Sequence, residues 1–523
     1  MHFLSDDLLA RIRSRAGEVD ATNSFPAADL ADLRGAGYLG AFVPAEFGGS
    51  GLGLTAIAAE QTRLAAAAPG TALGINMHQI IVGLGRFLVA HGNPRGEQIL
   101  RDAAAGEVFG FGISEPGNDL VLFGSTTKAS PAPGGGYSFE GTKIFTSLSP
   151  AWTRLLVFGR ADLDEGPKSV FGLVHRDDPG YSIVDDWDTL GMRATQSMTT
   201  RLEGVAVPGD RILTVTDPGP SEDPVVFGIF AHFEILLAAT YQGVGERAVQ
   251  VAAEHVKARR SVKNRTTYSN DPDIRWRIAE AALAMNAVGP QIRELARDVE
   301  AGADRGAAWM PQLSAVKNAA AEATLRAVEQ AMRACGGSAY YNSHELSRLY
   351  RDALAGIFQP SDQESLHGAW ANLVLGARRK LRERPAAGPR PSGRPDRAGR
   401  PSAWGAAAAA APPFRCRGPR PGGRRPSARP RRRARRGAVP ACWQHRGRRG
   451  GCAPGAATTP PPTSACRRPR PPRPSPSPWS PSRSSRGRRG CGRRTGPSRS
   501  RRPGRSGRAG PPRASSTSGT GAP

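Results

Sequence analysis

The chain has 523 residues, with 72 basic and 45 acidic side chains and a net charge of +27. A charge of this sign and size is typical of proteins that bind nucleic acid. The charge is uneven, however: 34 arginines and one acidic residue, Asp396, lie after residue 385, whereas the first 385 residues carry a net charge of −6. Basicity therefore does not support a nucleic-acid function for the first 385 residues.

Cysteine follows the same division. Cys335 is the one cysteine before residue 385, so a disulfide framework is excluded there. The five cysteines that follow show no CxxC pairing, and we expect no metal site. The first residues lack the apolar core of a signal peptide, and no run of about 18 apolar residues is evident that would cross a membrane. The composition predicts a cytoplasmic protein without a membrane partner.

Residues 1–107 are predicted to form an N-terminal helical domain. Ala- and Leu-rich segments follow the Phe25-Pro26 step, and residues 52–67 fit a helix with the usual start and stop signals. The glycines of residues 48–53 raise the question of a phosphate-binding loop. No β-branched strand precedes them and no Lys-Ser/Thr pair follows, so we interpret them as a plain loop.

Residues 108–220 are predicted to form a middle antiparallel β-domain. Four short apolar runs, separated by Gly, Pro and Asp, have the length of strands: residues 155–158, 170–174, 181–184 and 202–207. A segment of about 110 residues suits one compact barrel or sandwich.

Residues 221–382 are predicted to be a C-terminal four-helix bundle. Residues 233–255 and 312–333 are long, Ala-rich and almost free of helix breakers. Between them, apolar residues step by three and four and mark one helix face: Ile278, Ala282, Met285, Val288, Ile292, Leu295 and Val299. The fold class is therefore α+β, in the order helices, β-domain, helical bundle.

Residues 383–523 are predicted to be a disordered basic tail, because dense Arg, Pro, Gly and Ser cannot bury enough apolar surface to fold. The absence of Lys, Ile, Met, Tyr and Asn after residue 385 suggests a GC-rich gene translated in the wrong frame. The alternative is a real tail, which would bind RNA or DNA through phosphate contacts.

Four segments carry residues suited to cofactor chemistry: FGFGISEPGND at 109–119, GTKIFTS at 141–147, DTLGMRATQS at 188–197 and CGGSAYYNSHELSRLYRDALAGIFQPSDQESL at 335–366. Each also has a plain interpretation, such as a turn, a core aromatic residue or a surface charge. Their order and spacing resemble those of the acyl-CoA dehydrogenase family. The resemblance extends over residues 1–380 and implies a flavoprotein that holds FAD.

The resemblance assigns the flavin contacts. Phe111, Ile113 and Ser114 would lie along the isoalloxazine ring. Phe145 would stack on it, and the Ser147 hydroxyl would bond to its N5 atom, which favours hydride transfer. Asn118 follows the Pro-Gly step directly, where the family usually has Ala-Gly-Ser-Asp near the thioester, so the identity of the acyl carrier stays open.

Further residues are assigned to the substrate and to the distal half of FAD. Arg193 and Thr195 would hold a phosphate or carboxyl group of the substrate. Arg265 would reach the FAD diphosphate of a neighbouring subunit, since a guanidinium fork suits a diphosphate. The turn at Gly336-Gly337 would let the backbone approach the adenosine, and Ser361 and Gln363 would contact the flavin. Sharing of FAD in this way implies a homodimer or homotetramer.

The catalytic base is the main departure from the family. The glutamate that removes the α-proton of the acyl thioester corresponds to Gln359 or Pro360, depending on a one-residue gap, and neither accepts a proton. Pro360 also lacks a backbone N–H to bind the thioester oxygen. Some members supply the base from the position of Phe233, so the candidates for a substitute are Glu234, His232, Asp362 and Glu364, beside the absence of any internal base.

The resemblance implies an FAD-dependent oxidoreductase that introduces an α,β double bond into an acyl thioester of CoA or of an acyl carrier protein. Electrons would pass to an electron-transfer flavoprotein. Two alternatives stay open. The first is a flavin-dependent monooxygenase on the same scaffold, which needs no carboxylate base. The second is a catalytically silent scaffold that binds flavin without catalysing a reaction.

Overall fold

The computed structural model describes residues 2–376, and the predicted tail lies outside the described residues. Five helices come first: α1 (Asp6–Thr22), α2 (Ala27–Gly35), α3 (Leu54–Ala67), α4 (Pro69–Ala90) and α5 (Arg95–Ala104). The Ser5 hydroxyl accepts a bond from the backbone N–H of Leu8, which caps α1, and Asp6 and Asp7 lie in its positive first turn. The predicted loop at residues 48–53 is confirmed.

One eight-stranded sheet forms the middle of the chain, with the order β6-β7-β3-β2-β4-β5-β8 and with β1 paired to β4. The strands are β1 (Phe109–Gly112), β2 (Lys128–Ala132), β3 (Gly136–Thr146), β4 (Arg154–Leu163), β5 (Gly166–His175), β6 (Tyr181–Val184), β7 (Met198–Val207) and β8 (Ile212–Thr216). Most pairings are antiparallel as predicted, but β1 and β2 both pair with β4 in parallel. The chain from β1 to β4 therefore crosses the sheet rather than forming a meander.

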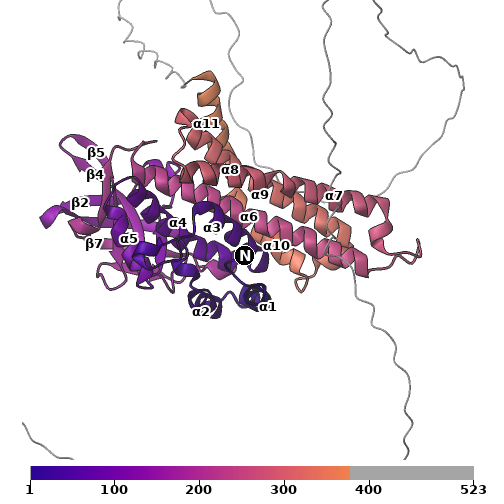
Figure 1. Ribbon diagram of the computed structural model, residues 1–523. Helices are drawn as coiled ribbons and strands as arrows, with labels where there is room; N and C mark the ends of the chain where they lie inside the picture. The colour runs from indigo at the N-terminus through magenta and orange to yellow at the C-terminus, as the bar shows by residue number, and fades with distance from the viewer. Residues whose placement is uncertain (1, 377–523) are drawn as a thin grey trace, which may run out of the picture. The chain divides into compact units, whose positions relative to one another are not determined.

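Four long helices follow, lying along one another in Figure 1: α6 (Pro224–Ala258), α7 (Pro272–Asn286), α8 (Val288–Glu300) and α9 (Trp309–Cys335). The prediction of one continuous apolar helix face from Ile278 to Val299 is wrong, because the helix breaks at Ala287. Pro290 lacks the N–H that would bond to the carbonyl of Asn286 and continue the helix. Ala282 is also exposed.

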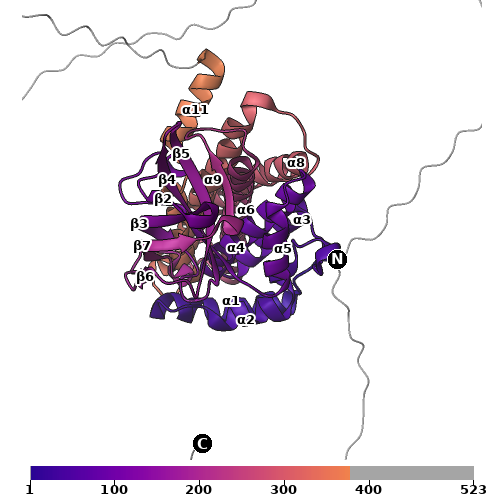
Figure 2. The same ribbon diagram turned by 90° about the vertical axis from the view of Figure 1, so that its left-hand side faces the viewer.

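Two shorter helices end the described chain, α10 (Glu345–Leu354) and α11 (Gln363–Leu375). Figures 1 and 2 show α11 projecting away from the bundle, and it has no buried residue in this structure. Residues 348–352 of the fourth motif segment lie in α10.

The interior is built on α4 and α6. By length and hydropathy alone, both helices could cross a membrane. The prediction that the chain contains no segment of this length and apolar character is therefore wrong. Both are also mostly buried, and α6 packs against α3, α4 and α9. Their apolar character is thus accounted for by a shared core between the N-terminal helices and the bundle.

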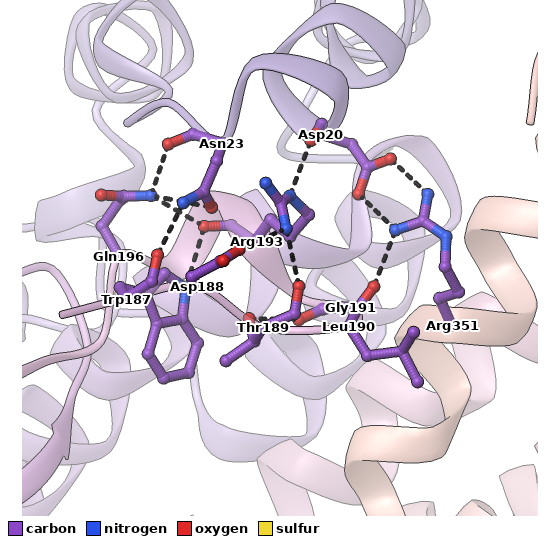
Figure 3. A network of polar contacts seen from close by, with 10 residues as sticks. All are labelled: Asp20, Asn23, Trp187, Asp188, Thr189, Leu190, Gly191, Arg193, Gln196 and Arg351. Carbon is purple, nitrogen blue, oxygen red and sulfur yellow. Dashed lines mark hydrogen bonds and ion pairs between the residues drawn. The ribbon is translucent and has the colours of Figure 1, made fainter.

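A loop between β6 and β7 joins the sheet to the helices. Gly191 passes so close to α10 that an added Cβ would lie 2.2 Å from the carbonyl oxygen of Arg351. Beside it, the backbone N–H of Met192 donates to Asp352 Oδ1 at 2.7 Å. Arg351 in turn binds the Asp20 carboxylate of α1 and the Leu190 carbonyl (Figure 3). Elements from the start, middle and end of the described chain meet at this point.

Candidate flavin site

A buried ion pair positions the first two motif segments. Lys143 on β3 donates to Glu115 Oε1 at 2.5 Å, and both side chains are inaccessible to solvent. Burial opposes ionisation of Glu115, but Lys143 and the hydrogen bonds from Ser125 and Thr126 outweigh it and lower the pKa of the carboxyl to about 2. The turn after β1 is thereby fixed to the inner face of β3.

The end of β3 presents an aromatic ring to solvent. The backbone N–H of Ile144 donates to the Ser114 carbonyl at 2.9 Å, which holds the two segments side by side. Phe145 then has a positive φ of 57° and a 58% exposed side chain, and it meets the edge of Trp187 at a centroid distance of 6.1 Å. A strained, exposed aromatic residue is typical of a ligand platform rather than of a core.

Behind Phe145, hydroxyl groups form a buried chain. The Ser147 and Ser197 hydroxyls are 2.8 Å apart, Ser197 donates to Thr195 Oγ1 at 2.7 Å, and Thr195 donates to the Met192 carbonyl at 2.9 Å. The Thr146 hydroxyl is buried beside them without a partner within the described residues. Thr195 is thus a link in this chain, and its predicted substrate contact stays a prediction.

Two phenylalanines close the helical side. Phe111 of β1 and Phe233 of α6 stack at 5.5 Å with an interplanar angle of 20°. Ile113 is buried next to them. Asn118, assigned to the substrate, donates to Glu115 Oε2 and to the Gly124 carbonyl, both at 2.8 Å. Its amide therefore closes the loop after the Pro-Gly step.

The segment at the expected base position is held by polar contacts. Tyr241 donates to Gln359 Oε1 at 2.8 Å. Lys317 of α9 donates to three backbone carbonyls, those of Gly356, Gln359 and Ser361. Gln359 and Pro360 thus lie in a loop whose backbone is held by the buried Lys317.

Glu234 lies against the same loop. It is fully buried, and its Oε1 atom accepts bonds from the Ser361 backbone N–H at 3.1 Å and the Ser361 hydroxyl at 2.7 Å. Burial raises the pKa of Glu234 to about 7, although Ser361 and Lys317 oppose this. Its Oε2 atom is buried without a hydrogen-bond partner within residues 2–376. Ser361, assigned to the flavin, is thus also the partner of Glu234.

The other candidate bases are placed differently. Asp362 caps α11 by accepting from the Ser365 backbone N–H, and although burial opposes ionisation, these bonds lower its pKa. Gln363 and Glu364 are exposed at the start of that helix. His232 is buried, and burial lowers its pKa to about 4, while its Nδ1 atom lies 2.7 Å from the Gly228 carbonyl oxygen.

Arg193 makes its contacts within the protein. Its Nε atom donates to the Asp20 carbonyl at 2.9 Å, and its Nη1 atom to Asp188 Oδ1 at 3.1 Å and the Thr189 carbonyl at 2.8 Å (Figure 3). The guanidinium predicted to hold a substrate thus ties α1 to the 187–196 loop.

At the far end of α6, the structure brings Arg259 rather than Arg265 to the glycine turn. Arg259 ends α6, donates to the Cys335 carbonyl at 2.9 Å and lies over the Tyr268 ring. Gly336 has a φ of 70° and would place a Cβ 3.8 Å from Arg259, whereas Arg265 is exposed. The Arg-x-x-aromatic pattern selects Arg265, which is followed by Tyr268, over Arg259, which is followed by Val262. The assignment of Arg265 to the diphosphate of a neighbouring subunit stays a prediction.

Comparisons with known proteins agree with this architecture. Residues 7–107 match the model of the acyl-CoA dehydrogenase N-terminal domain and residues 224–358 that of the acyl-CoA dehydrogenase C-terminal domain. The chain is 30% identical to the amino sugar nitrososynthase RubN8 of Streptomyces rubradiris, over 68% of this chain and 84% of that protein. It is 29% identical to the putative acyl-CoA dehydrogenase YdbM of Bacillus subtilis, over 66% and 88%.

A solved structure gives the same result. KijD3, in complex with FMN and dTDP-3-amino-2,3,6-trideoxy-4-keto-3-methyl-D-glucose, has a TM-score of 0.63 and 27% identity, covering 71% of this chain and 92% of KijD3. Fold and site together define a flavin-dependent oxidoreductase. The chain belongs to the acyl-CoA dehydrogenase family, in the divergent part that is similar to nitrososynthases. The predicted fold and flavin cofactor, FAD in this family, are confirmed.

The residues at the site fit a flavin. The exposed Phe145 ring offers a stacking surface, the Ser147 hydroxyl offers a lone pair, and Phe111 with Phe233 supplies an apolar wall. The Thr146 hydroxyl, which has no partner among residues 2–376, offers a donor. The assignment of individual residues to flavin atoms stays a prediction.

Proposed function

We propose that this protein is a flavin-dependent monooxygenase that oxidises the amino group of a nucleotide-linked amino sugar. The observation that carries the proposal is the loop at Gln359-Pro360, where an amide bound to Tyr241 and the pyrrolidine ring of a proline stand in place of a carboxylate. A neutral amine has its own nucleophilic lone pair, so its oxidation requires no base at this position.

Each turnover balances as amine, O₂ and reduced flavin giving hydroxylamine, water and oxidised flavin. Reduced flavin supplies the two electrons that turn one oxygen atom into water while the other is inserted at nitrogen. A separate NAD(P)H-dependent flavin reductase would replace the electron-transfer flavoprotein as redox partner. Support for the substrate class comes from the similarity to RubN8, an amino sugar nitrososynthase, and to KijD3, whose structure holds a dTDP-linked amino sugar.

The chain's own residues have defined tasks in this proposal. The wall of Phe111 and Phe233 excludes water from the reacting face. The Ser147 hydroxyl donates its hydrogen to Ser197, which donates to Thr195, so a lone pair of Ser147 is left to accept from an N–H at the ring edge of the reduced flavin. Lys317 holds the loop that faces the substrate, and it keeps the Gln359 amide in one orientation through the backbone.

A second function, dehydrogenation of an acyl thioester, has one observation in its favour. Glu234 has a pKa near 7, the value suited to a general base, and a free Oε2 atom. The putative acyl-CoA dehydrogenase YdbM is consistent with it. In that case the electron-transfer flavoprotein expected from the family would be the acceptor.

Two matched assays on the flavin-loaded protein separate these functions. Under nitrogen, a panel of acyl-CoA thioesters should leave the oxidised flavin absorbance unchanged. In air, with a flavin reductase and a dTDP-linked amino sugar, oxygen uptake should accompany a product heavier by one oxygen atom. Anaerobic bleaching by a thioester would instead establish dehydrogenation. Inactivity in both assays with flavin retained would favour the silent scaffold.

We also propose that two or more copies share the flavin, as the family resemblance implies. Phe111 and Phe145 belong to the sheet, whereas Arg259 and Gly336 belong to the end of α6 and the end of α9. Light scattering of the flavin-loaded protein should give a dimer or a tetramer.

A further inference from the structure

A cleft of about 680 Å³ lies between α1, the 187–193 loop and the start of α10. Small polar residues line it together with four arginines and two acids, which are Arg13, Arg193, Arg348, Arg351, Asp20 and Glu345. Figure 3 shows one wall, where Asp20, Arg193 and Arg351 meet. No residue of the flavin site described above, apart from Arg193, lines this cleft.

One acid of the cleft is already committed. Asp20 receives both donors of Arg351, and its backbone carbonyl accepts from Arg193. Arg193 and Arg351 are therefore satisfied by protein groups, and they form a rigid edge to the cleft. Neither carboxylate oxygen of Asp20 is bound to Arg13 or Arg348.

Glu345, the second acid of the cleft, faces more than one guanidinium group. Arg247 takes both oxygens of Glu345, at 2.9 and 2.8 Å. Arg348 reaches the same carboxylate only at 3.7 Å, has a side chain that is 9% exposed and has no hydrogen bond among the described residues. Two guanidinium groups, those of Arg247 and Arg348, thus face one carboxylate.

Arg13 adds a third guanidinium to the same place. Its Nε atom is buried without a partner among the described residues, and no ion pair within them involves its side chain. Burial lowers the pKa of Arg13, and the charge of Arg247 lowers it further, whereas Glu345 and Glu254 raise it. A half-buried guanidinium whose Nε atom has no partner among the described residues is costly, and an anion in the cleft would reduce that cost.

We propose that this cleft binds the phosphate or diphosphate group of a small-molecule ligand between Arg13 and Arg348. The planar guanidinium fork matches phosphate oxygens in two parallel bonds, which is why arginine predominates in such sites. Ser14, Asn342 and Ser343 line the same cleft and offer further donors. The inference is independent of the proposed oxidation of an amine.

The test uses thermal unfolding and calorimetric titration of the full-length, FAD-loaded protein in phosphate-free buffer. Pyrophosphate should raise the unfolding temperature of the wild type. Arg13→Met should weaken pyrophosphate binding roughly 10- to 100-fold, the value of one charge-assisted hydrogen-bonded pair. Without ligand, Arg13→Met should unfold at the same or a higher temperature, because it removes a half-buried charge that has no partner within the described residues.

The controls separate this cleft from the arginines after residue 385 and from the cofactor. Arg160→Met, an exposed arginine of β4, should bind pyrophosphate as the wild type does. Arg348→Lys keeps the charge but loses the fork, so it should bind less tightly than the wild type and more tightly than Arg348→Met. ADP as a second probe shows whether a nucleotide is preferred over the inorganic ion.

Three results would overturn the proposal. The first is an equal effect of pyrophosphate on the wild type, Arg13→Met and Arg160→Met. The second is a ligand-free Arg13→Met protein that unfolds at a lower temperature and still binds pyrophosphate with unchanged affinity. The third is binding confined to flavin-free protein and competed by FAD, which would assign the cleft to the cofactor.

Discussion

Glu234 shows how one side chain decides between two chemistries. It is fully buried and accepts two hydrogen bonds from Ser361. Burial raises its pKa, and the positive charge of Lys317 opposes this rise. In the dehydrogenase function it would be the base. In the monooxygenase function its task is to hold Ser361, which a neutral amide also does.

Glu234→Gln should leave amine oxidation near the wild-type rate, since glutamine still accepts from Ser361. The pKa of Glu234 rises from 4.5 to about 7 on folding, so its favourable contribution is complete below pH 4.5 and is lost as the pH rises through 7. At pH 8 the variant should therefore gain on the order of 1–3 kcal/mol in unfolding free energy over the wild type. Urea denaturation at pH 5 and pH 8 measures the difference.

The outcome for activity is equally specific. If Glu234→Gln abolishes anaerobic bleaching by a thioester while flavin stays bound, Glu234 is the base and the monooxygenase proposal is wrong. Glu165→Gln, on an exposed residue of the turn between β4 and β5, is the control with unchanged activity and stability.

At this scale the sequence predicted which motifs lie together but not what each side chain contacts. The pairing of Ser114 with Ile144 confirms that the first two motifs are neighbours. By contrast, the sequence does not show that Arg259 lies at the glycine turn, because this depends on where α6 ends. The burial of Glu234 likewise depends on a loop that lies 127 residues away in the chain.

Among the elements, α9 holds the loop from Gly356 to Ser361 through Lys317, and at Ser361 also through Ser314 and Asn318. Lys317 is buried and bridges three of its carbonyls, and burial lowers the pKa of this lysine to about 8 although Glu234 opposes the shift. The carbonyls of an irregular loop lack the backbone N–H donors of a helix or sheet, and the ammonium group of Lys317 takes the place of these donors.

Lys317→Met should loosen this loop and destabilise the protein by about 2–5 kcal/mol, because the Gly356 and Gln359 carbonyls lose their lysine donor and Glu234 loses a nearby positive charge. Hydrogen exchange of residues 356–362 should accelerate more than exchange elsewhere in the bundle. Lys128→Met, an exposed lysine on β2, should change neither quantity. Unchanged exchange in Lys317→Met would show that the loop is held by other contacts.

Element prediction succeeded where the pattern is long and local. The 35-residue α6 and 27-residue α9 follow from continuous Ala-rich segments. It failed where the outcome depends on one residue or on distant pairing. Pro290 breaks a run whose apolar period continues, and the parallel pairing of β1 and β2 with β4 is a matter of topology that alternation of side chains does not encode.

For the whole molecule, every described element ends by residue 376, and both family models end by residue 358. A shortened chain of residues 1–385 should therefore retain its flavin and its unfolding temperature. It should also lose binding to a cation exchanger near neutral pH, since its net charge is −6 instead of +27.

Flavin absorbance per protein and differential scanning calorimetry of the two chains check this expectation. Loss of flavin or a lower unfolding temperature in the shorter chain would show that residues after 385 contribute to the fold. Peptides from these residues, detected by mass spectrometry in the source cells, would exclude a frame error.

The ion pair between Asp20 and Arg351 also sets an order for biosynthesis, because its partners are 331 residues apart in the chain. At about 5–20 residues per second, a ribosome needs on the order of 15–65 s to deliver Arg351 after Asp20 has emerged. Throughout that interval the polar side of α1 faces solvent or a chaperone. Attachment of α1 to α10 is therefore expected among the last steps of folding.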